Sequence, residues 1–499
     1  MPPETDVRDP GARTARDAPF ADIRTLRARY RDGSLLPSEF VAATFRLLDR
    51  WEPDIGAFLT VARERATAEA RAADRLLHRE GPGAWRGRPL LGMPVTVKDL
   101  TATEGIRTTR GSLLNAHTVP DRDAPAVARL RAAGAIVVGK TNTSEGGWSA
   151  AGKNRLQGPT RNPWDLSRSS GGSSAGAAAS VAVGIGVGAT GTDGAGSIRV
   201  PAAFCGVVGF KPSLGRVPYV PQSAEELSHL GPLTRTVGDA AELLAVMAGF
   251  DADDPLSFGL SGEVGADTDA AAGRLPRLRI GWIRSLGGPG PDPAIVAVAR
   301  QAVEELAARG HHVEEIDPPF EDPYPALVTI LAGWEAAALP YDEPGSTGLL
   351  DQDRLEVVRH GRGLSAAALA RAYECRALLR ARSLALMSRY DLLAMPTVGI
   401  GPFAAERHAP PPGPGARPGG PPDWLAWAPE AYTFNLTGQP AVSVPAGLTP
   451  AGLPVGLQLV GPLHQDTRVL AAARQLEQSA PWHHWYPRLA ARRPEEETT

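Results

Sequence analysis

Two glycine-rich runs that carry serine constrain this chain more than any other feature. Residues 169–176 read Ser-Ser-Gly-Gly-Ser-Ser-Ala-Gly, and residues 191–199 read Gly-Thr-Asp-Gly-Ala-Gly-Ser-Ile-Arg. Glycine has no Cβ, so such runs occur where the main chain bends sharply or approaches a ligand closely. Serine hydroxyls within them predict a site at which hydroxyls and backbone N–H groups meet one small substrate. Upstream, Lys98 ends the strand-like segment 94–97.

The composition is that of a soluble enzyme with a large core. The chain has 499 residues, of which 43% are hydrophobic and 21% charged, and both fractions are normal for globular proteins. Its net charge of −3 argues against a nucleic-acid partner, because nucleic-acid binders usually carry a basic surface.

Cysteine content and hydropathy exclude two further classes. The two cysteines, Cys205 and Cys375, exclude a disulfide framework and a cysteine-based zinc site. The N-terminus is polar and lacks the apolar core of a signal peptide. The most apolar stretch, residues 175–191, consists mainly of Ala, Gly and Val and lacks the large side chains of a membrane span. We therefore expect a cytoplasmic protein without a membrane partner.

The order of predicted elements favours an α/β fold. Amphipathic helices are expected between residues 21 and 80, and a pair of strands at 440–444 and 455–460. Other strands and helices alternate between them, which is typical of α/β architecture. The remaining predicted strands are 90–100, 135–138, 207–210, 278–282 and 313–316, and the remaining predicted helices are 123–133, 236–247, 293–309 and 466–478.

The chain shows no internal repeat and no strong linker, so we predict one large domain over residues 19–490 between two tails, 1–18 and 491–499. The N-terminal tail is expected to be disordered. Within the domain we expect N-terminal helices at 19–84, the core motifs at 85–250 and a variable, substrate-side region at 251–430. The proline- and glycine-rich segment 402–422 excludes a helix or a central strand and predicts a long surface loop.

Two nucleotide-binding patterns occur literally but in the wrong context. Residues 134–141 match the P-loop expression, yet the residues between its glycines are Ala-Ile-Val-Val, which favour a core strand instead of a phosphate-binding loop. Residues 186–191 match the dinucleotide fingerprint, yet Thr-Asp-Gly-Ala-Gly follows and would break the helix that this fingerprint must open.

Residues 172–176 match the nucleophile elbow of α/β-hydrolases, with Ser174 as the nucleophile. That elbow needs a buried strand immediately before it, and residues 165–170 are polar. No histidine partner is singled out by the sequence. An esterase of this type stays open as an alternative, with four candidate histidines: His229, His360, His408 and His464.

The spacing of Lys98, Ser173 and Ser197, together with the text around them, resembles the amidase signature family. Ser173 lies 75 residues after Lys98, and Ser197 lies 24 residues further on. The resemblance runs from about residue 20 to about residue 490 and includes both stand-alone bacterial amidases and the amidase subunit of glutamyl-tRNA amidotransferase. Further family landmarks are KTNT at 140–143, RNPWD at 161–165, GPLTRT at 231–236 and NLTGQP at 435–440.

The resemblance implies a large mixed β-sheet covered on both faces by helices, and a catalytic triad. Ser197 would be the nucleophile and Lys98 would be the base. Ser173, which would carry a cis peptide bond, would relay a proton between them. The chemistry is coherent, because a serine hydroxyl is a poor nucleophile until a base removes its proton. Lysine, with an ordinary pKa of about 10.4, becomes such a base when burial lowers its pKa.

The turn that contains Ser197 is expected to form the oxyanion hole. The backbone N–H groups of Gly194, Ala195, Gly196 and Ser197 could converge on one oxygen, and each donor of this kind contributes about 3–4 kcal/mol. Family members most often have glycine where Ala195 stands, so a positive φ there would strain this chain. Three neighbouring residues are expected to support the loops: Ser174, Asp193 and Arg199.

The implied activity is hydrolysis of a carboxylic amide through an acyl-enzyme on Ser197, with release of ammonia or an amine. Neither a metal nor an organic cofactor is implied, and the partner is a small-molecule amide, with a homodimer as one option for the assembly. The alternative within the family is a subunit that releases ammonia from glutamine for a tRNA-bound amino acid and works with partner chains. Four aromatic residues outside the motifs are candidates for the substrate pocket: Tyr219, Trp334, Trp427 and Tyr432.

Overall fold

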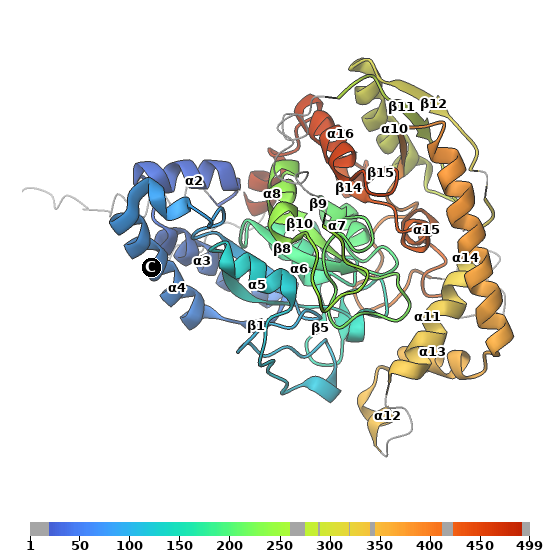
Figure 1. Ribbon diagram of the computed structural model, residues 1–499, viewed down its shortest axis with the longest axis horizontal. Coiled ribbons are helices and arrows are strands. Elements are labelled where there is room, and N and C mark those ends of the chain that lie inside the picture. Colours follow the sequence, from blue (N-terminus) through green and yellow to red (C-terminus); the bar gives the residue numbers. More distant parts are fainter. Residues whose placement is uncertain are drawn as a thin grey trace, which may run out of the picture.

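A mixed sheet of 11 strands forms the centre of the molecule in the described part of the chain. The computed structural model describes residues 19–259, 275–287, 290–318, 320–339, 345–411 and 423–491. The strand order is β1-β3-β2-β8-β10-β9-β14-β15-β13-β11-β12 (Figure 1). Strand β2 runs parallel to β3 and β8, and β11 runs parallel to β12 and β13, whereas the other pairs are antiparallel.

The sheet strands are drawn from the chain between residues 58 and 460, and two small hairpins accompany them. The sheet strands are β1 (Phe58–Val61), β2 (Pro94–Lys98), β3 (Ile136–Thr141), β8 (Gly188–Asp193), β9 (Val208–Lys211), β10 (His229–Thr234), β11 (Arg279–Trp282), β12 (His312–Glu315), β13 (Leu392–Pro396), β14 (Ala441–Leu448) and β15 (Pro454–Val460). The hairpins pair β4 (Lys153–Asn154) with β5 (Gly158–Pro159), and β6 (Arg161–Asn162) with β7 (Asp165–Ser169).

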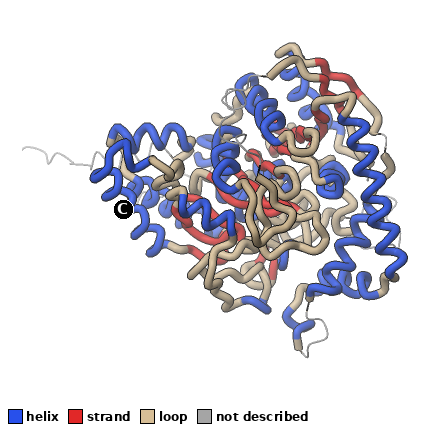
Figure 2. Tube along the Cα trace, in the orientation of Figure 1, coloured by secondary structure: helices blue, strands red, loops and turns tan. Residues whose placement is uncertain are grey.

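Helices surround this sheet, with α2, α3 and α4 together at one side of the view and the long α14 at the other (Figure 1). Figure 2 shows most of the strands inside the molecule, strands β11 and β12 near its edge, helices around the sheet and a large area of loops in the centre of the view. The α-helices are α2 (Ile23–Asp32), α3 (Pro37–Ile55), α4 (Arg63–Glu80), α5 (Pro125–Ala132), α6 (Ala175–Ala182), α7 (Arg199–Cys205), α8 (Val237–Met247), α10 (Pro293–Ala308), α11 (Tyr324–Ala338), α12 (Ser346–Leu349), α13 (Gln352–Arg362), α14 (Ala366–Met387), α15 (Pro429–Thr437), α16 (Asp466–Ser479) and α17 (Trp485–Ala491). Short 3₁₀ helices are η1 (Gly81–Trp85), η2 (Leu113–Asn115) and η3 (Glu145–Gly147).

Glycines in the sheet allow α7 to lie close against it. A Cβ at Gly209 of β9 would stand 2.5 Å from the Cβ of Ala202, and one at Gly456 of β15 would stand 2.7 Å from the Cβ of Ala203. Both distances are shorter than side chains tolerate, so only glycine admits the helix at this depth. The close packing matters for function because α7 begins two residues after Ser197.

The sequence predicts most of this architecture. The expected strands at 90–100 and 278–282 contain β2 and β11 wholly, those at 207–210 and 313–316 contain most of β9 and β12, and that at 135–138 contains the first half of β3. The expected strand pair near the C-terminus is β14 and β15. The P-loop-like residues 134–141 include strand β3, which follows helix α5. No described helix is long and apolar enough to cross a membrane.

Strand β8 is one of several elements that the sequence analysis did not predict, together with strands β1, β10 and β13 and helices α7 and α11 to α15. The residues of β8 read Gly-Ala-Thr-Gly-Thr-Asp, and glycine disfavours strands in general. Here the glycines make room for neighbours, since a Cβ at Gly188 would stand 2.6 Å from Leu243 and one at Gly191 would stand 2.5 Å from Leu233. Tertiary packing therefore overrides local propensity in this strand.

The predicted surface loop at 402–422 is only partly described. Residues 402–411 do not lie on the surface throughout, because Phe403, Ala405 and His408 are buried and Ala404 forms a β-bridge with Arg168. Residues 412–422 lie outside the described residues, as do the predicted N-terminal tail and residues 492–499 of the C-terminal tail.

Candidate active site

Lys98 stands at the C-terminal end of β2 and points into a group of hydroxyls. Its Nζ donates hydrogen bonds to Ser173 Oγ at 2.8 Å, Ser174 Oγ at 2.9 Å and Thr192 Oγ1 at 2.8 Å. The parallel pairing of β2 with β8 brings Lys98 and Thr192 to the same end of the sheet. The Lys98 side chain is thus fully enclosed, with a relative exposure of 0%.

This enclosure changes the acid–base character of Lys98. Burial lowers the pKa of Lys98 well below its ordinary value, and the negative charge of Asp193 opposes the shift only in part. A dry environment disfavours the ammonium form because it removes the water that solvates the charge. The amine is therefore disposed to be neutral and to accept a proton.

Ser173 and Ser197 line one cavity of about 140 Å³, and a cis peptide bond joins Gly172 to Ser173. Ser197 is 8% exposed, against 1% for Ser173, so Ser197 is the more accessible residue of the two. Among the described contacts, no hydrogen bond joins the two serine hydroxyls. The two glycine-rich segments are instead joined through their backbones, because Ser174 N donates to Ser197 O at 3.0 Å.

The carboxylate of Asp193 organises the turn before Ser197. It accepts hydrogen bonds from Gly196 N at 2.6 Å and from Ile198 N at 3.1 Å. The expected set of four oxyanion donors is therefore too large, because the Gly196 N–H is already engaged with Asp193. The N–H groups of Gly194, Ala195 and Ser197 make no hydrogen bond with the described residues and stay available.

The strain expected at Ala195 does not arise. Ala195 is absent from the residues with positive φ, and the left-handed position in this turn belongs to Gly196, with φ of +108°. A Cβ at Gly196 would stand 2.6 Å from the Cβ of Ala431. Glycine is thus required at 196, while alanine is compatible with the backbone at 195.

Arg199 anchors this turn to the C-terminal part of the chain. Its guanidinium forms two contacts with the Asp193 carboxylate, at 2.9 and 3.0 Å, and also donates to Gln458 at 2.7 Å and Asn435 at 2.6 Å. Burial alone would raise the pKa of Asp193, but the charge of Arg199 outweighs this effect and holds that pKa well below its ordinary value. The buried pair thus stays ionised and fixes the loop.

Ser174 occupies the N-cap position of α6, yet its hydroxyl does not cap the helix. It accepts from Lys98 and donates to Thr192 O at 3.1 Å. Its relative exposure is 0%, and it does not line the cavity. No histidine contacts it in the described part of the chain, so the esterase alternative with Ser174 as nucleophile finds no geometric support.

Two of the four predicted pocket aromatics lie in the cavity wall and two do not. Tyr219 and Trp334 line the cavity. Trp427 instead packs in the core against Phe204, at a ring distance of 6.2 Å. Tyr432 is fully buried and donates to Asp322 at 2.8 Å. Sequence alone could not separate these cases, because all four are aromatic residues outside recognisable motifs.

The sequence analysis missed several residues of the site. Thr192 lies inside the second glycine-rich run, where its contact with Lys98 could have been suspected. Arg110 gave no signal, since a single arginine in a loop has no characteristic pattern. The other missed residues include an apolar group that lines the cavity: Leu100, Trp148, Leu331, Val357 and Leu425.

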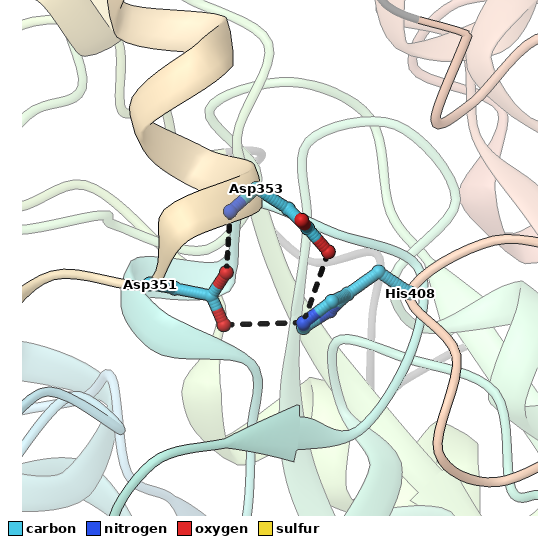
Figure 3. A group of neighbouring side chains, drawn as sticks. All are labelled: Asp351, Asp353 and His408. Atoms are coloured by element: carbon cyan, nitrogen blue, oxygen red, sulfur yellow. Dashed lines mark hydrogen bonds and ion pairs between the residues drawn. The ribbon is translucent and has the colours of Figure 1, made fainter.

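One group of side chains near the cavity could offer ligands to a metal ion. Asp351, Asp353 and His408 provide one ligand atom each within 4.8 Å of one another (Figure 3). His408 Nε2 lies 3.1 Å from Asp351 and 3.8 Å from Asp353, whose side chain is 65% exposed. Asp351 is the N-cap of α13 and already accepts from Asp353 N at 3.0 Å. We interpret this group as an ion pair that holds the segment 402–411.

Comparisons with known proteins extend over almost the whole chain. The family model described as Amidase matches residues 39–470. An acylamidase of Rhodococcus erythropolis is 35% identical over 476 residues, covering 92% of this chain and 95% of the relative. A glutamyl-tRNA(Gln) amidotransferase subunit of Thermus thermophilus is 36% identical over 484 residues, covering 91% of this chain and 96% of the relative.

Solved structures give the same result. A bacterial aryl acylamidase of the amidase signature family superposes with a TM-score of 0.86 at 27% identity, covering 95% of this chain and 99% of the other. The 6-aminohexanoate cyclic dimer hydrolase, in complex with its substrate, superposes with a TM-score of 0.85 at 28% identity and the same coverage. The chain therefore belongs to the amidase signature family.

Proposed function

We propose that this protein hydrolyses the C–N bond of small carboxylic amides through an acyl-enzyme on Ser197. In the first half of the reaction the neutral Lys98 amine takes the proton of Ser173, and Ser173 takes the proton of Ser197. The Ser197 oxygen then attacks the amide carbonyl carbon, and the carbonyl oxygen becomes an oxyanion. The proton on Lys98 returns through Ser173 to the leaving nitrogen, which departs as ammonia or an amine.

In the second half, water attacks the Ser197 ester and the carboxylic acid leaves. The same relay would take the proton of the water molecule and return it to the Ser197 oxygen. The N–H groups of Gly194, Ala195 and Ser197 are the donors left for the oxyanion, and such donors stabilise the transition state more than the ground state. Because Ser173 and Ser197 share no hydrogen bond among the described contacts, the relay needs a small approach of the two hydroxyls on substrate binding, as catalytic contacts often do.

One observation carries the proposal. A fully buried lysine, with its pKa lowered by that burial, contacts Ser173 at 2.8 Å beneath a cavity that exposes the Ser197 hydroxyl. The partners of Lys98 are three hydroxyls and one carbonyl oxygen. Burial among hydroxyls does not distinguish Lys98 by itself, because the buried Lys140 also donates to two threonine hydroxyls and a carbonyl oxygen. What distinguishes Lys98 is its contact with Ser173, which lines the same cavity as Ser197.

The test is the Ser197→Ala variant. It should lose amide turnover and covalent labelling by a fluorophosphonate, while its unfolding temperature stays close to that of the unsubstituted protein. Ser174→Ala is the matched control for the label, because it removes the neighbouring hydroxyl and leaves Ser197 in place. Labelling that persists in Ser197→Ala would refute the assignment of the nucleophile.

A second candidate function is glutamine hydrolysis for a tRNA-dependent amidotransferase. It is favoured by the 36% identity to the Thermus thermophilus amidotransferase subunit over 484 residues. This function would require partner chains, so the discriminating measurements are glutaminase activity and co-purification of such partners. Hydrolysis of aryl or alkyl amides by the isolated chain, without glutaminase activity, would decide for the stand-alone enzyme.

A further inference from the structure

The proposed catalytic cavity contains one cationic side chain that has no partner among the described residues. Arg110 lines the cavity together with Ser173 and Ser197, and within the described part of the chain its guanidinium makes no hydrogen bond and no ion pair. Other half-buried arginines of this chain do have partners, as Arg129 and Arg131 have with Asp251 and Asp123. A guanidinium without protein acceptors inside a cavity is free to bind a ligand, because its five N–H donors otherwise depend on water alone.

The backbone holds Arg110 firmly in place. Its φ of +56° lies in the left-handed region, which is rare for residues other than glycine. Arg110 N donates to Asp99 O at 3.2 Å, and Gly146 N donates to Arg110 O at 2.7 Å. The Asp99 carboxylate also accepts from the N–H groups on either side, those of Thr109 and Gly111. Such strain usually persists where the surrounding structure fixes a functional side chain.

These contacts tie Arg110 to the proposed catalytic residues. Asp99 directly follows Lys98 in the chain, so the residue that shapes the Arg110 turn is covalently attached to the proposed base. On the other side, Gly146 precedes Gly147, and a Cβ at Gly147 would stand 3.3 Å from Ser173 Oγ. The turn around Arg110 is therefore hydrogen-bonded on one side to Asp99, the neighbour of Lys98, and on the other side to Gly146, the neighbour of the glycine that lies near Ser173.

Neither of the other charged groups that line the cavity forms an ion pair with Arg110 in the described structure. Glu335 pairs with Arg354 at 2.8 Å. Glu225 accepts hydrogen bonds from Ser223 and Ser228, and no ion pair between Glu225 and Arg110 occurs in the described structure. Burial raises the pKa of Tyr219, the charge of Arg110 opposes this shift and that of Glu225 adds to it. Both charges thus lie close enough to the Tyr219 phenol to affect its pKa.

We propose that Arg110 binds a carboxylate carried by the substrate, so that the enzyme prefers amides with an anionic group to neutral or cationic ones. This inference rests on the proposed amide hydrolysis and names its substrate class. A planar guanidinium matches a carboxylate with two parallel hydrogen bonds. The indoles of Trp148, Trp334 and Trp424 line the same cavity and suit the apolar part of such a substrate.

The test uses sets of amides that differ only in charge. Glutaryl, hexanoyl and ω-aminopentanoyl para-nitroanilides carry an anionic, a neutral and a cationic acyl group of similar length. N-hexanoyl para-aminobenzoate and N-hexanoyl aniline form a second set, in which the amine part of the amide either carries a carboxylate or is neutral. We expect kcat/KM to be about 10- to 100-fold higher for the anionic member of at least one set, which corresponds to a charge-assisted hydrogen-bond pair.

Arg110→Gln should abolish that preference by raising KM for the anionic amide, while kcat/KM for the neutral amide changes little. This split is the signature of lost uniform binding. Arg110→Lys should recover part of the preference, and Arg110→Glu should shift it toward the cationic amide. Arg122→Gln is the matched control, because the Arg122 side chain is 78% exposed and lies outside the cavity lining.

The outcomes separate this inference from the proposed function. If neutral amides are hydrolysed and Ser197 is labelled by a fluorophosphonate, but no set shows an anionic preference, the assignment of Arg110 is wrong and the amidase proposal stands. If Arg110→Gln slows all amides equally, Arg110 has a structural role and the inference also fails. Loss of both labelling and turnover in the unsubstituted protein would overturn the proposed function itself.

Discussion

The floor and the wall of the proposed catalytic cavity are built in different ways. The floor comes from residues 98–199, and its polar groups bind one another: Lys98 contacts three hydroxyls, and Asp193 contacts Arg199 and two backbone N–H groups. The wall comes from scattered segments near residues 110, 219, 334 and 424, and it presents aromatic rings and a guanidinium that has no partner among the described residues. The floor is thus preorganised for chemistry, whereas the wall can vary with the substrate.

The largest expected effect is on the floor, in Lys98→Ala. Removal of the base should lower kcat/KM about 10²- to 10⁴-fold at neutral pH, the range of general-base catalysis. Lys98→Arg should lower kcat/KM to a similar extent, because arginine keeps its proton and cannot act as a base. Lys153→Ala is the matched control, since Lys153 donates to the backbone oxygen of Glu406 at an exposed position. Near-normal rates in Lys98→Ala would exclude it as the base.

The pH profile of the unsubstituted enzyme sharpens this prediction. The proposed mechanism requires the neutral amine of Lys98, and burial lowers the pKa of Lys98 well below 10.5. Activity should therefore rise with pH through an acidic limb and reach its plateau well below pH 10.5. A profile of kcat/KM that kept rising up to the ordinary lysine pKa would contradict a desolvated base.

The oxyanion turn offers a pair of opposite substitutions. Gly196→Ala would place a Cβ 2.6 Å from Ala431 at a φ of +108°, so the turn must shift, and we expect turnover to fall about 10²- to 10³-fold. Ala195→Gly needs no shift. It should lower the free energy of unfolding by only about 0.4–1 kcal/mol, because glycine adds entropy to the unfolded chain. Comparable losses of turnover in both variants would show that the donors are placed otherwise.

Substitutions at two tryptophans distinguish a residue of the cavity wall from a residue of the core behind it. Trp427 is 4% exposed and packs against Phe403, so Trp427→Ala should lower the free energy of unfolding by about 3–5 kcal/mol. Trp334 is half-buried and lines the cavity. Trp334→Ala should leave the unfolding temperature nearly unchanged and raise KM for amides with an apolar group. Urea unfolding and steady-state kinetics measure both, and an exchange of the two phenotypes would contradict this placement.

The same contrast explains how much the sequence could reveal. The floor is encoded in short contiguous runs around Lys98, Ser173 and Ser197, so it was predictable that these residues lie at one site. Their catalytic roles stay a proposal. The engagement of the Gly196 N–H was not predictable, because it depends on where the Asp193 carboxylate points. The wall is assembled from distant loops by tertiary packing, so nothing in the local sequence distinguishes Trp334 from Trp427 or marks Arg110.

The smallest expected effect concerns the ion pair between His408 and Asp351, which holds segment 402–411 beside the cavity. The His408 ring lies 4.9 Å from the ring of Trp148, a residue of the wall. His408→Ala should lower the free energy of unfolding by about 1.5–3 kcal/mol, the range for a hydrogen bond to a charged group, and should raise KM more than it lowers kcat.

The pH dependence distinguishes this ion pair from a metal site. Burial alone would raise the pKa of Asp351, but the hydrogen bond and charge of His408 outweigh it and hold that pKa below 3.8. The stability due to this shift is present above pH 3.8 and is lost as the pH falls through the lowered pKa. The difference in free energy of unfolding between the unsubstituted protein and His408→Ala, measured by urea unfolding, should therefore become smaller below about pH 4. A rise in unfolding temperature with added zinc, absent in His408→Ala, would instead make Asp351, Asp353 and His408 metal ligands.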